Sequence, residues 1–426
     1  MVLESVEDQI MDYNRMRETL PRHLPKKVFI WDETLRDGEQ TPGTFLTVDE
    51  KVYLSKVLDE IGVKVIVPSY PAVSESEKMV VKALSRENLV NTKVAATARP
   101  RRADIDACLD CDVGEIPIFM STSRILLKYS LRKSVEEAVE MLVDAINYAR
   151  DHGVVVDFVA EDATRAYFNE LMKICLAAID AGADKIALAD TLGIMRPTSM
   201  KYLVGRVRDE LNSRFNRNVP LSVHCHNDFG LATANTLAGV EEGVIYPHTC
   251  VNGYGERGGN ASFEEVVVSL ELLYKVDTGI KLDRIYEVSQ IFERTFGIPL
   301  SVHKPLVGDN SFRHESGIHV YALLRNKSTY EPFPPELIGR QTELFLGKKS
   351  GRHIVKYLLQ EEGIEATDEQ IKEIVYELKK KQEEQSKEII RARFMDVKEK
   401  MRTLQKGIFK SEFLEIARKV IEKKIN

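Results

Sequence analysis

The chain has 426 residues, 43% hydrophobic and 30% charged, which is ordinary for a globular protein and enough for one large domain with appendages. Sixty Lys and Arg against 66 Asp and Glu give a formal net charge of −6, so no basic surface favours nucleic acid or an anionic membrane as a partner. The five cysteines and the lack of a signal peptide or membrane-length apolar stretch predict a cytoplasmic protein.

Residues 1–26 form an N-terminal arm to which the sequence assigns no role. From residue 28 to about 250, short apolar strands alternate with amphipathic helices. The strands are predicted at 28–32, 63–67, 93–97, 115–119, 154–161, 185–190, 221–226 and 246–252. Eight such units favour a (β/α)₈ TIM barrel over residues 27–300, and no GxGxxG follows the first strand to support a doubly wound sheet.

The pattern changes after the barrel. Residues 301–349 hold four of the fifteen prolines and few periodic runs, which indicates a linker subdomain. Residues 350–426 are mostly helical, with helices predicted at 350–363, 367–389 and 410–424. The expected fold class is therefore α/β: a (β/α)₈ barrel, a linker subdomain and a small C-terminal helical subdomain.

Polar residues gather where the predicted strands end, which is where barrel enzymes place their chemistry. His224 and His226 in "LSVHCHND" share one face of a strand and could form half of a divalent metal site, although a surface pair of histidines is the alternative. Asp37 follows strand one, which barrel closure brings beside the last strands. Asn260 in "NGYGERGGN" could add an amide oxygen. These ligands suit Mg²⁺, Mn²⁺, Zn²⁺ or Co²⁺.

Three more residues are candidates for chemistry. Arg36, beside Asp37, could stabilise a developing enolate or alkoxide. Its alternative role is a salt bridge to Glu39 or Glu33. Glu161 ends strand five and is placed for general base work. Thr191 in "ADTLG" could hydrogen-bond a substrate carboxylate.

Several long motifs carry a resemblance to a known family. In chain order they are "DETLRDGEQTPG", "STSRILLKYSLR", "AEDATR", "ADTLG", "SVHCHNDFGLATANTLAGVEEG", "NGYGERGGNASFEEVV", "HESGIH" and "LGKKSGRH". With them the chain resembles the metal-dependent barrel enzymes that include 2-isopropylmalate, homocitrate and citramalate synthases. The resemblance implies condensation of acetyl-CoA with a 2-oxo acid, which would chelate a divalent metal, followed by release of CoA.

The matching motifs also imply roles for single residues. The implied metal ligands are Asp37, His224, His226 and Asn260. The implied catalytic residues are Arg36, Glu161, His319 and Tyr330, and the implied substrate-binding residues are Gln40, Thr191 and Arg124. In the family the residues matching His319 and Tyr330 reach the site from the partner chain, which implies a domain-swapped homodimer.

The chain departs from the family pattern at its pocket. The second strand of the family usually ends in a glutamate, as in "IEAGFP", where this chain has Val67 in "IVPSYP". Pro117 and Val159 also stand where polar residues are usual, and Arg124 stands where an acid is common. The apolar changes favour a 2-oxo acid with an apolar side chain, whereas an inward-facing Arg124 would favour a second carboxylate. The sequence leaves these two substrate classes open.

Two other functions remain as alternatives. A carbon–carbon lyase or aldolase could use the same metal barrel without a CoA thioester. A diverged binding or regulatory protein could retain the metal and have lost turnover.

Overall fold

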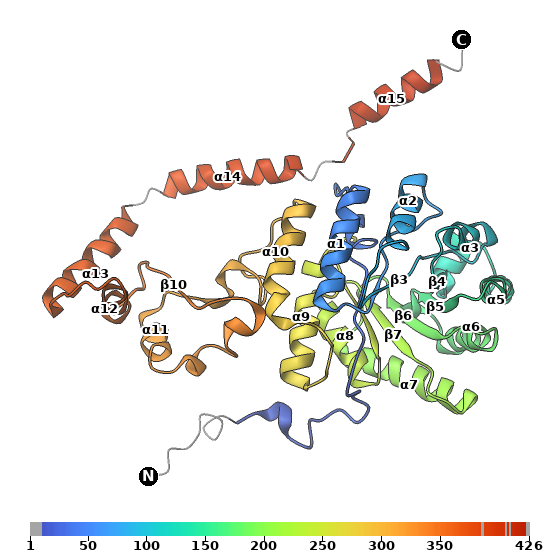
Figure 1. Cartoon of the computed structure of the whole chain (residues 1–426), viewed down its shortest axis with the longest axis horizontal. Helices are drawn as coiled ribbons and strands as arrows, with labels where there is room; N and C mark the ends of the chain where they lie inside the picture. The colour runs from blue at the N-terminus through green and yellow to red at the C-terminus, as the bar shows by residue number, and fades with distance from the viewer. Residues whose placement is uncertain (1–10, 385–386, 405–406, 409, 423–426) are drawn as a thin grey trace.

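The computed structural model describes residues 11–384, 387–404, 407–408 and 410–422 (Figure 1). Its strands are β1 (Trp31–Asp32), β2 (Val65–Ile66), β3 (Lys93–Val94), β4 (Glu115–Ser121), β5 (Val155–Glu161), β6 (Lys185–Asp190), β7 (Leu221–Cys225), β8 (Tyr246–Thr249), β9 (Arg313–His314) and β10 (Glu343–Leu344). Its α-helices are α1 (Val48–Ile61), α2 (Glu75–Leu84), α3 (Arg102–Leu109), α4 (Arg124–Leu126), α5 (Val135–Asp151), α6 (Phe168–Asp180), α7 (Pro197–Phe215), α8 (Ala232–Glu241), α9 (Phe263–Ser269), α10 (Ile285–Phe296), α11 (Gly317–Leu323), α12 (Arg352–Glu361), α13 (Asp368–Glu383), α14 (Lys387–Leu404) and α15 (Lys410–Glu422).

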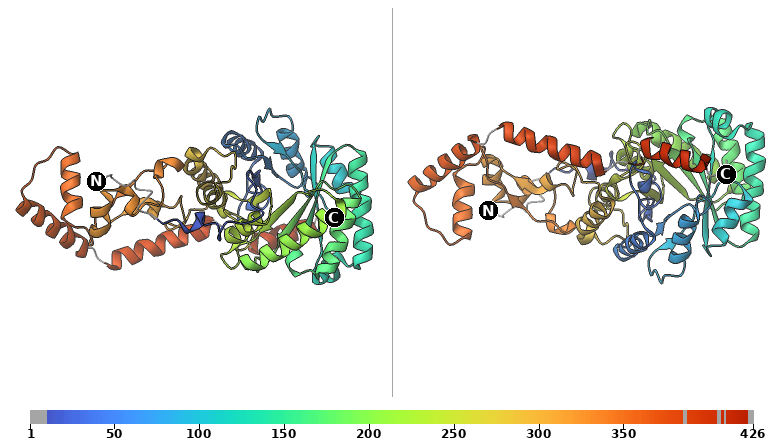
Figure 2. Two further views of the ribbon diagram at one scale, coloured as in Figure 1. Left: turned by 90° about the horizontal axis from the view of Figure 1, so that it is seen from below. Right: turned by 90° about the horizontal axis from the view of Figure 1, so that it is seen from above.

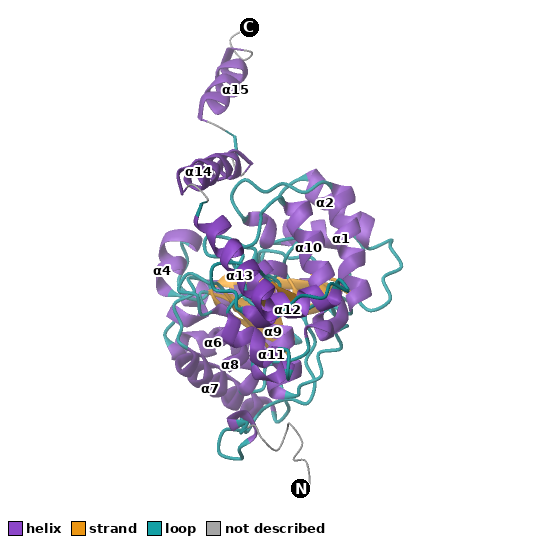
Figure 3. Ribbon diagram, turned by 90° about the vertical axis from the view of Figure 1, so that its left-hand side faces the viewer, coloured by secondary structure: helices purple, strands orange, loops and turns teal. Residues whose placement is uncertain are grey.

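Within the described residues, eight parallel strands close into a barrel. Their hydrogen-bonded order is β3-β2-β1-β8-β7-β6-β5-β4. The outermost strands of this order, β3 and β4, meet through the bridges Ala95–Glu115 and Ala98–Ile118. Figure 3 shows the strands enclosed by the surrounding helices. The predicted (β/α)₈ barrel is confirmed, although β1, β2 and β3 each pair over two residues and are shorter than predicted.

Alternate residues of each strand face opposite sides of the barrel wall. Phe158 and Val223 face outward and belong to the large apolar core between strands and helices. Trp31 and Val67 face inward and belong to a small separate cluster. Because His224 follows Val223, this alternation turns its side chain into the barrel.

The residues at the two ends of α1 determine where this helix begins and where the chain turns into β2. α1 begins at a capping box in which Thr47 and Glu50 satisfy each other's backbone N–H groups. It ends at Gly62, whose φ is +109°. A Cβ atom there would lie 2.4 Å from the carbonyl oxygen of Gly279, so only glycine fits this turn into β2.

A buried lysine ties three strands together at the N-terminal end of the barrel. Lys185 pairs with Glu115, and its Nζ lies 3.1 Å from Asp157 Oδ2. The same Nζ lies 5.1 Å and 4.7 Å from the ring centroids of Trp31 and Tyr246. Burial and the neighbouring Glu115 carboxylate raise the pKa of Asp157. One ammonium group therefore compensates two carboxylates in the barrel interior.

Lys185→Met is expected to lower the free energy of unfolding by about 3–5 kcal/mol, because it leaves buried carboxylates without their cation. Urea denaturation measures this loss. A triple variant that adds Glu115→Gln and Asp157→Asn removes all three charges and should recover most of it. Equal losses in both variants would assign the effect to packing instead of charge.

After α10 the chain builds a second group of elements. β9 and β10 form a short parallel pair, and α11, α12 and α13 pack around a core of Val320, Ile354, Val355 and Ile371. Figures 1 and 2 show this group beside the barrel, with α10 between it and the barrel strands. None of the described helices is long and apolar enough to cross a lipid bilayer.

The single helix predicted over 367–389 is wrong. α13 ends at Glu383 and α14 begins at Lys387; residues 385–386 lie outside the described part of the chain. The run "KKKQEEQSKE" has no apolar side chain that could pack against a neighbour, so little holds one continuous helix there. α14 then continues to Leu404, and its Ile389, Ile390 and Phe394 are exposed.

Candidate active site and metal centre

Three side chains with ligand atoms converge at the C-terminal ends of β1 and β7. His224 Nε2 lies 3.2 Å from Asp37 Oδ2, and His226 Nε2 lies 3.9 Å from the same oxygen. The two Nε2 atoms are 3.4 Å apart. All three side chains are buried. The structure thus brings together three of the residues expected as ligands, at a spacing that could hold one cation.

The turn after β1 places Asp37 over this point. The carbonyl of Glu33 accepts from the N–H groups of Arg36 and Asp37, at 3.1 Å and 2.7 Å. Asp32 Oδ1 accepts from the N–H of Thr34 at 2.9 Å. These bonds fold "DETLRD" into a compact turn, and the pairing of β1 with β8 sets that turn beside β7.

A glycine-rich loop delivers Asn260 to the same place. Asn260 forms an antiparallel bridge with His226, and its N–H donates to the Gly253 carbonyl at 3.0 Å. Gly259 has φ +84°, and a Cβ there would lie 2.0 Å from Gly253 O. Asn260 Oδ1 is buried without a hydrogen-bond partner among the described residues. An unsatisfied amide oxygen beside two imidazoles fits a fourth ligand of a cation.

The charges at this centre have the forms that bind metal. Burial opposes ionisation of Asp37, but the Arg36 guanidinium and the hydrogen bond from His224 hold its pKa well below the usual range. Burial and the neighbouring His224 lower the pKa of His226 to about 4. At neutral pH Asp37 is therefore a carboxylate and His226 a neutral imidazole, as a divalent cation requires.

A second set of side chains backs this centre and was not recognised as part of the site from the sequence. Glu33 Oε2 accepts from Arg36 Nε at 2.9 Å, and Glu33 Oε1 accepts from Trp31 Nε1 at 2.9 Å. The His248 ring stacks on Trp31 at a centroid distance of 4.9 Å. In the sequence these residues read as ordinary strand positions. The one signal in the sequence for their role in the site was that Trp31 and Glu33, two residues apart, share the inward face of strand one.

Two more expected residues lie on neighbouring strand ends. Glu161 closes β5, hydrogen-bonds Ser121 at the end of β4, and has a pKa raised by burial against the lowering effect of that bond. Thr191 follows β6, and its Oγ1 accepts from the N–H of Asp162 at 2.9 Å. Glu161 and Thr191 are thus adjacent at the barrel mouth.

The remaining expected residues are not gathered at this centre. Gln40 is exposed in the turn after Asp37. Arg124 has a side chain 63% exposed, and its Nη2 lies 2.6 Å from Glu170 Oε1 on α6. The rings of His319 and Tyr330 stack at 4.2 Å in the α11 region, outside the barrel (Figure 1).

The apolar positions noted in the sequence line the barrel interior. Val67 is fully buried beside Trp31. Val159 pairs in register with Phe119, and Pro117 pairs with Asp157 one layer deeper. The layer of the wall next to Glu161, formed by Val159 and Phe119, is therefore apolar, and the charged Asp157 lies one layer deeper.

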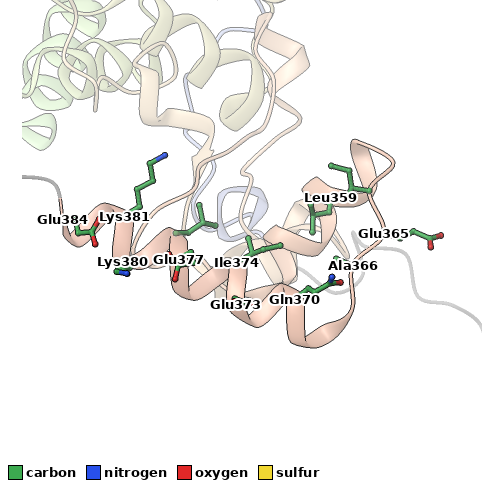
Figure 4. Close-up of a pocket in the computed structure, with 12 residues that line it drawn as sticks. Leu359, Glu365, Ala366, Gln370, Glu373, Ile374, Glu377, Lys380, Lys381 and Glu384 are labelled. Atoms are coloured by element: carbon green, nitrogen blue, oxygen red, sulfur yellow. The ribbon is translucent and has the colours of Figure 1, made fainter.

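A hollow elsewhere in the molecule has none of this chemistry. It measures about 850 Å³ and lies along α12 and α13, lined by Leu359, Ile374 and Leu378 with Glu373 and Lys381 among its polar residues (Figure 4). No metal-ligand group of the described residues lies there. The candidate metal centre among the described residues thus lies at the barrel mouth and not in this hollow.

Comparison with known proteins places this barrel in a class. The family model described as HMGL-like matches residues 27–292. The model described as "Homocitrate synthase post-HMGL domain-like" matches residues 306–386. Fold and site thus define a barrel enzyme of the HMGL-like class.

The relatives narrow the class. The chain is 46% identical over 371 residues to a probable 2-isopropylmalate synthase of Ignicoccus hospitalis, covering 87% of this chain and 91% of that protein. It is 44% identical to the homocitrate synthase AksA of Methanothermobacter thermautotrophicus (84% and 90% covered) and 45% identical to the (R)-citramalate synthase CimA of Methanocaldococcus jannaschii (83% and 70%). The chain belongs to the family of 2-isopropylmalate, homocitrate and citramalate synthases.

Solved structures support the fold. The crystal structure of a Bacillus subtilis HMG-CoA lyase has a TM-score of 0.58 at 23% identity and covers 66% of this chain and 97% of that chain. At this identity the likeness concerns the barrel alone.

Proposed function

We propose that this protein condenses acetyl-CoA with a 2-oxo acid in a reaction that requires a divalent cation. The observation that carries the proposal is the convergence of Asp37, His224 and His226 beside the unsatisfied Asn260 oxygen, in a chain whose relatives are named synthases.

The cation would be held by Asp37, His224, His226 and Asn260. Mg²⁺, Mn²⁺, Zn²⁺ and Co²⁺ all accept this mixture of carboxylate, imidazole and amide ligands. A cation bound there supplies Lewis acidity toward the ketone of the 2-oxo acid.

The protein's own groups would orient the reactants and handle charge. Arg36, held at the edge of the centre, offers a fixed positive charge to a developing enolate or alkoxide. Glu161 would accept or return a proton at the neighbouring strand end. Thr191 would hydrogen-bond the 2-oxo acid carboxylate, and Gln40, which is exposed in the turn after Asp37, would contact the bound substrate.

The 2-oxo acid would carry an apolar side chain. Val159 and Phe119 form an apolar wall below Glu161, and Val67 is part of the same interior. Arg124, which could recognise a second carboxylate, is paired with Glu170 of α6 and has a side chain 63% exposed. The structure therefore supports pyruvate or 2-oxoisovalerate over 2-oxoglutarate or oxaloacetate.

Thiol release from acetyl-CoA tests the proposal directly. The folded protein is offered pyruvate, 2-oxoisovalerate, 2-oxoglutarate, oxaloacetate and phenylpyruvate, each with EDTA, Mg²⁺ or Mn²⁺. We expect release that depends on the cation and on one of the apolar acids. The absence of thiol release with every acid would contradict the proposal. Carbon–carbon cleavage without a CoA thioester would establish the lyase alternative.

Glu161→Gln is expected to reduce kcat by about 10²–10⁴-fold, the usual contribution of a positioned acid or base. Because burial raises the pKa of Glu161, its carboxylate form is lost as pH falls through a value above that of a free glutamate. The wild-type kcat/KM profile should fall along this acidic limb, and the variant should lack the limb. An identical limb in Glu161→Gln would assign it to another group.

We further propose that two chains share their sites. The divisions are an N-terminal arm (1–26), a barrel (27–300), a linker subdomain (301–349) and a helical subdomain (350–426). His319 and the neighbouring Ile318 are exposed on α11, and α14 exposes an apolar face, so a single chain leaves these surfaces uncovered. A domain-swapped homodimer would bring His319 and Tyr330 of the partner subunit to the barrel mouth.

We also propose a cytoplasmic location, which is supported by five buried, unpaired cysteines.

A further inference from the structure

We propose that Glu33 is the positioning residue for Arg36, and that it supplies from the first strand the carboxylate that the family usually carries where this chain has Val67. The inference rests on the proposed function, because Arg36 matters only if an anion forms beside it.

Glu33 binds one edge of the Arg36 guanidinium group. Its Oε2 accepts from Arg36 Nε at 2.9 Å and lies 2.9 Å from Nη2, while Arg36 Nη1 lies 3.3 Å from Asp37 Oδ2. Oε1 of Glu33 is occupied by the Trp31 indole N–H. Glu33 also lies near His224 and His248 in a group that could hold a cation, but its oxygens already bind Arg36 and Trp31. Both Glu33 oxygens thus accept hydrogen bonds at 2.9 Å, shorter than the 3.3 Å between Arg36 Nη1 and Asp37 Oδ2, and this indicates a positioning role for Glu33.

Strand register explains why Glu33 can replace a carboxylate at position 67. β1 and β2 pair in parallel with Trp31 opposite Val65 and Asp32 opposite Ile66. The next pair along the two strands is Glu33 and Val67, and both side chains are buried. Both face inward, because each stands two residues after an inward residue. A carboxylate moved from 67 to 33 therefore shifts by one strand within the same layer of the barrel.

The other acid that could have paired with Arg36 is committed elsewhere. Glu39 lies 2.5 Å from Lys51 Nζ and accepts from the N–H of Leu46 at 2.9 Å. Val67 packs among apolar side chains and offers no charge. Among these candidates Glu33 is the one that fixes the orientation of Arg36.

Loss of Glu33 should act on both Arg36 and Asp37. Without it, the guanidinium keeps Asp37 as its sole carboxylate partner among these residues. Arg36 would then compete with a cation for Asp37 and would be free to rotate away from the forming anion. Positioning partners of this kind typically change metal affinity or activity by about 10–100-fold.

The test compares Glu33→Val, Glu33→Gln and the swap Glu33→Val with Val67→Glu. kcat and KM for CoA release and calorimetric Mn²⁺ affinity are measured for each. We expect Glu33→Val to lose about 10–100-fold in kcat and in Mn²⁺ affinity with little change in KM, and the swap to regain most of both losses. Glu33→Gln, which keeps the shape and the bond to Trp31, should fall between them and carries the test if Glu33→Val does not fold.

Asp59→Asn is the matched control. Asp59 is a buried carboxylate at the end of α1 that accepts from the N–H groups of Val90, Asn91 and Thr92. Its loss should lower the melting temperature without changing kcat or Mn²⁺ affinity. Wild-type values in Glu33→Gln, or a folded swap variant no better than Glu33→Val, would overturn the inference. If the wild type released no CoA with any acid, the proposed function would fail, and the Mn²⁺ affinities would still decide the role of Glu33.

Discussion

Asp37→Asn is expected to abolish divalent cation binding and to reduce CoA release by at least about 1,000-fold. Lewis-acid assistance contributes several kcal/mol to such reactions, and each 1.36 kcal/mol corresponds to a tenfold change in rate. Among the residues that the structure describes, Asp37 is the one carboxylate grouped with both His224 and His226, and its Oδ2 is the atom that both imidazoles face. Asparagine preserves the size of the side chain but removes the negative charge and leaves Arg36 to repel an incoming cation.

Calorimetric titration with Mn²⁺ and the thiol assay check this prediction independently. Glu39→Gln is the control, since Glu39 lies two residues further along but pairs with Lys51 instead of facing the histidines. It should keep both Mn²⁺ binding and turnover. Undiminished Mn²⁺ affinity in folded Asp37→Asn would move the cation to another set of ligands, and Glu33 with His224 and His248 would be the set to examine.

The barrel and the centre of its site could be predicted because they follow from local periodicity. A two-residue spacing on a strand puts His224 and His226 on one face, whatever the remainder of the fold. Closure of eight parallel strands then makes β1 a neighbour of β8 and brings Asp37 to β7. Asn260 follows because the glycines around it allow a loop too tight for other residues.

The ion-pair partners that orient the site residues, such as the partner of Arg36, could not be predicted from local periodicity. Spacing allowed Arg36 to pair with either Glu33 or Glu39, and the choice depends on Lys51, which is brought to Glu39 by the packing of α1. The end of α13 at Glu383 was missed for a similar reason, because the charged run that follows continues the helical periodicity but has no apolar side chain to bury in a core. Pairings of this kind depend on which side chains become neighbours only after folding.

His319 and Tyr330 pose the sharpest question, because within one chain they lie away from the centre that the barrel builds. If His319 of the partner subunit completes each site, His319→Ala alone should be nearly inactive. An equal mixture of Asp37→Asn and His319→Ala chains should then regain about one quarter of wild-type activity, since half of the randomly mixed dimers are hybrids and each hybrid has one intact site. Thiol release is measured after subunit exchange, with hybrid formation followed by native mass spectrometry.

A mixture of Asp37→Asn with His224→Ala is the matched control for this experiment. Both changes disable the barrel centre, so every barrel in every hybrid carries a defect and no activity should return. Recovery in the first mixture but not in the second would show that one chain's linker subdomain serves the other chain's barrel. Full activity of His319→Ala alone would remove His319 from the site. Inactivity of the first mixture despite complete exchange would mean that His319 acts within its own chain, which would require the α11 region to move toward the barrel mouth from its position against α12.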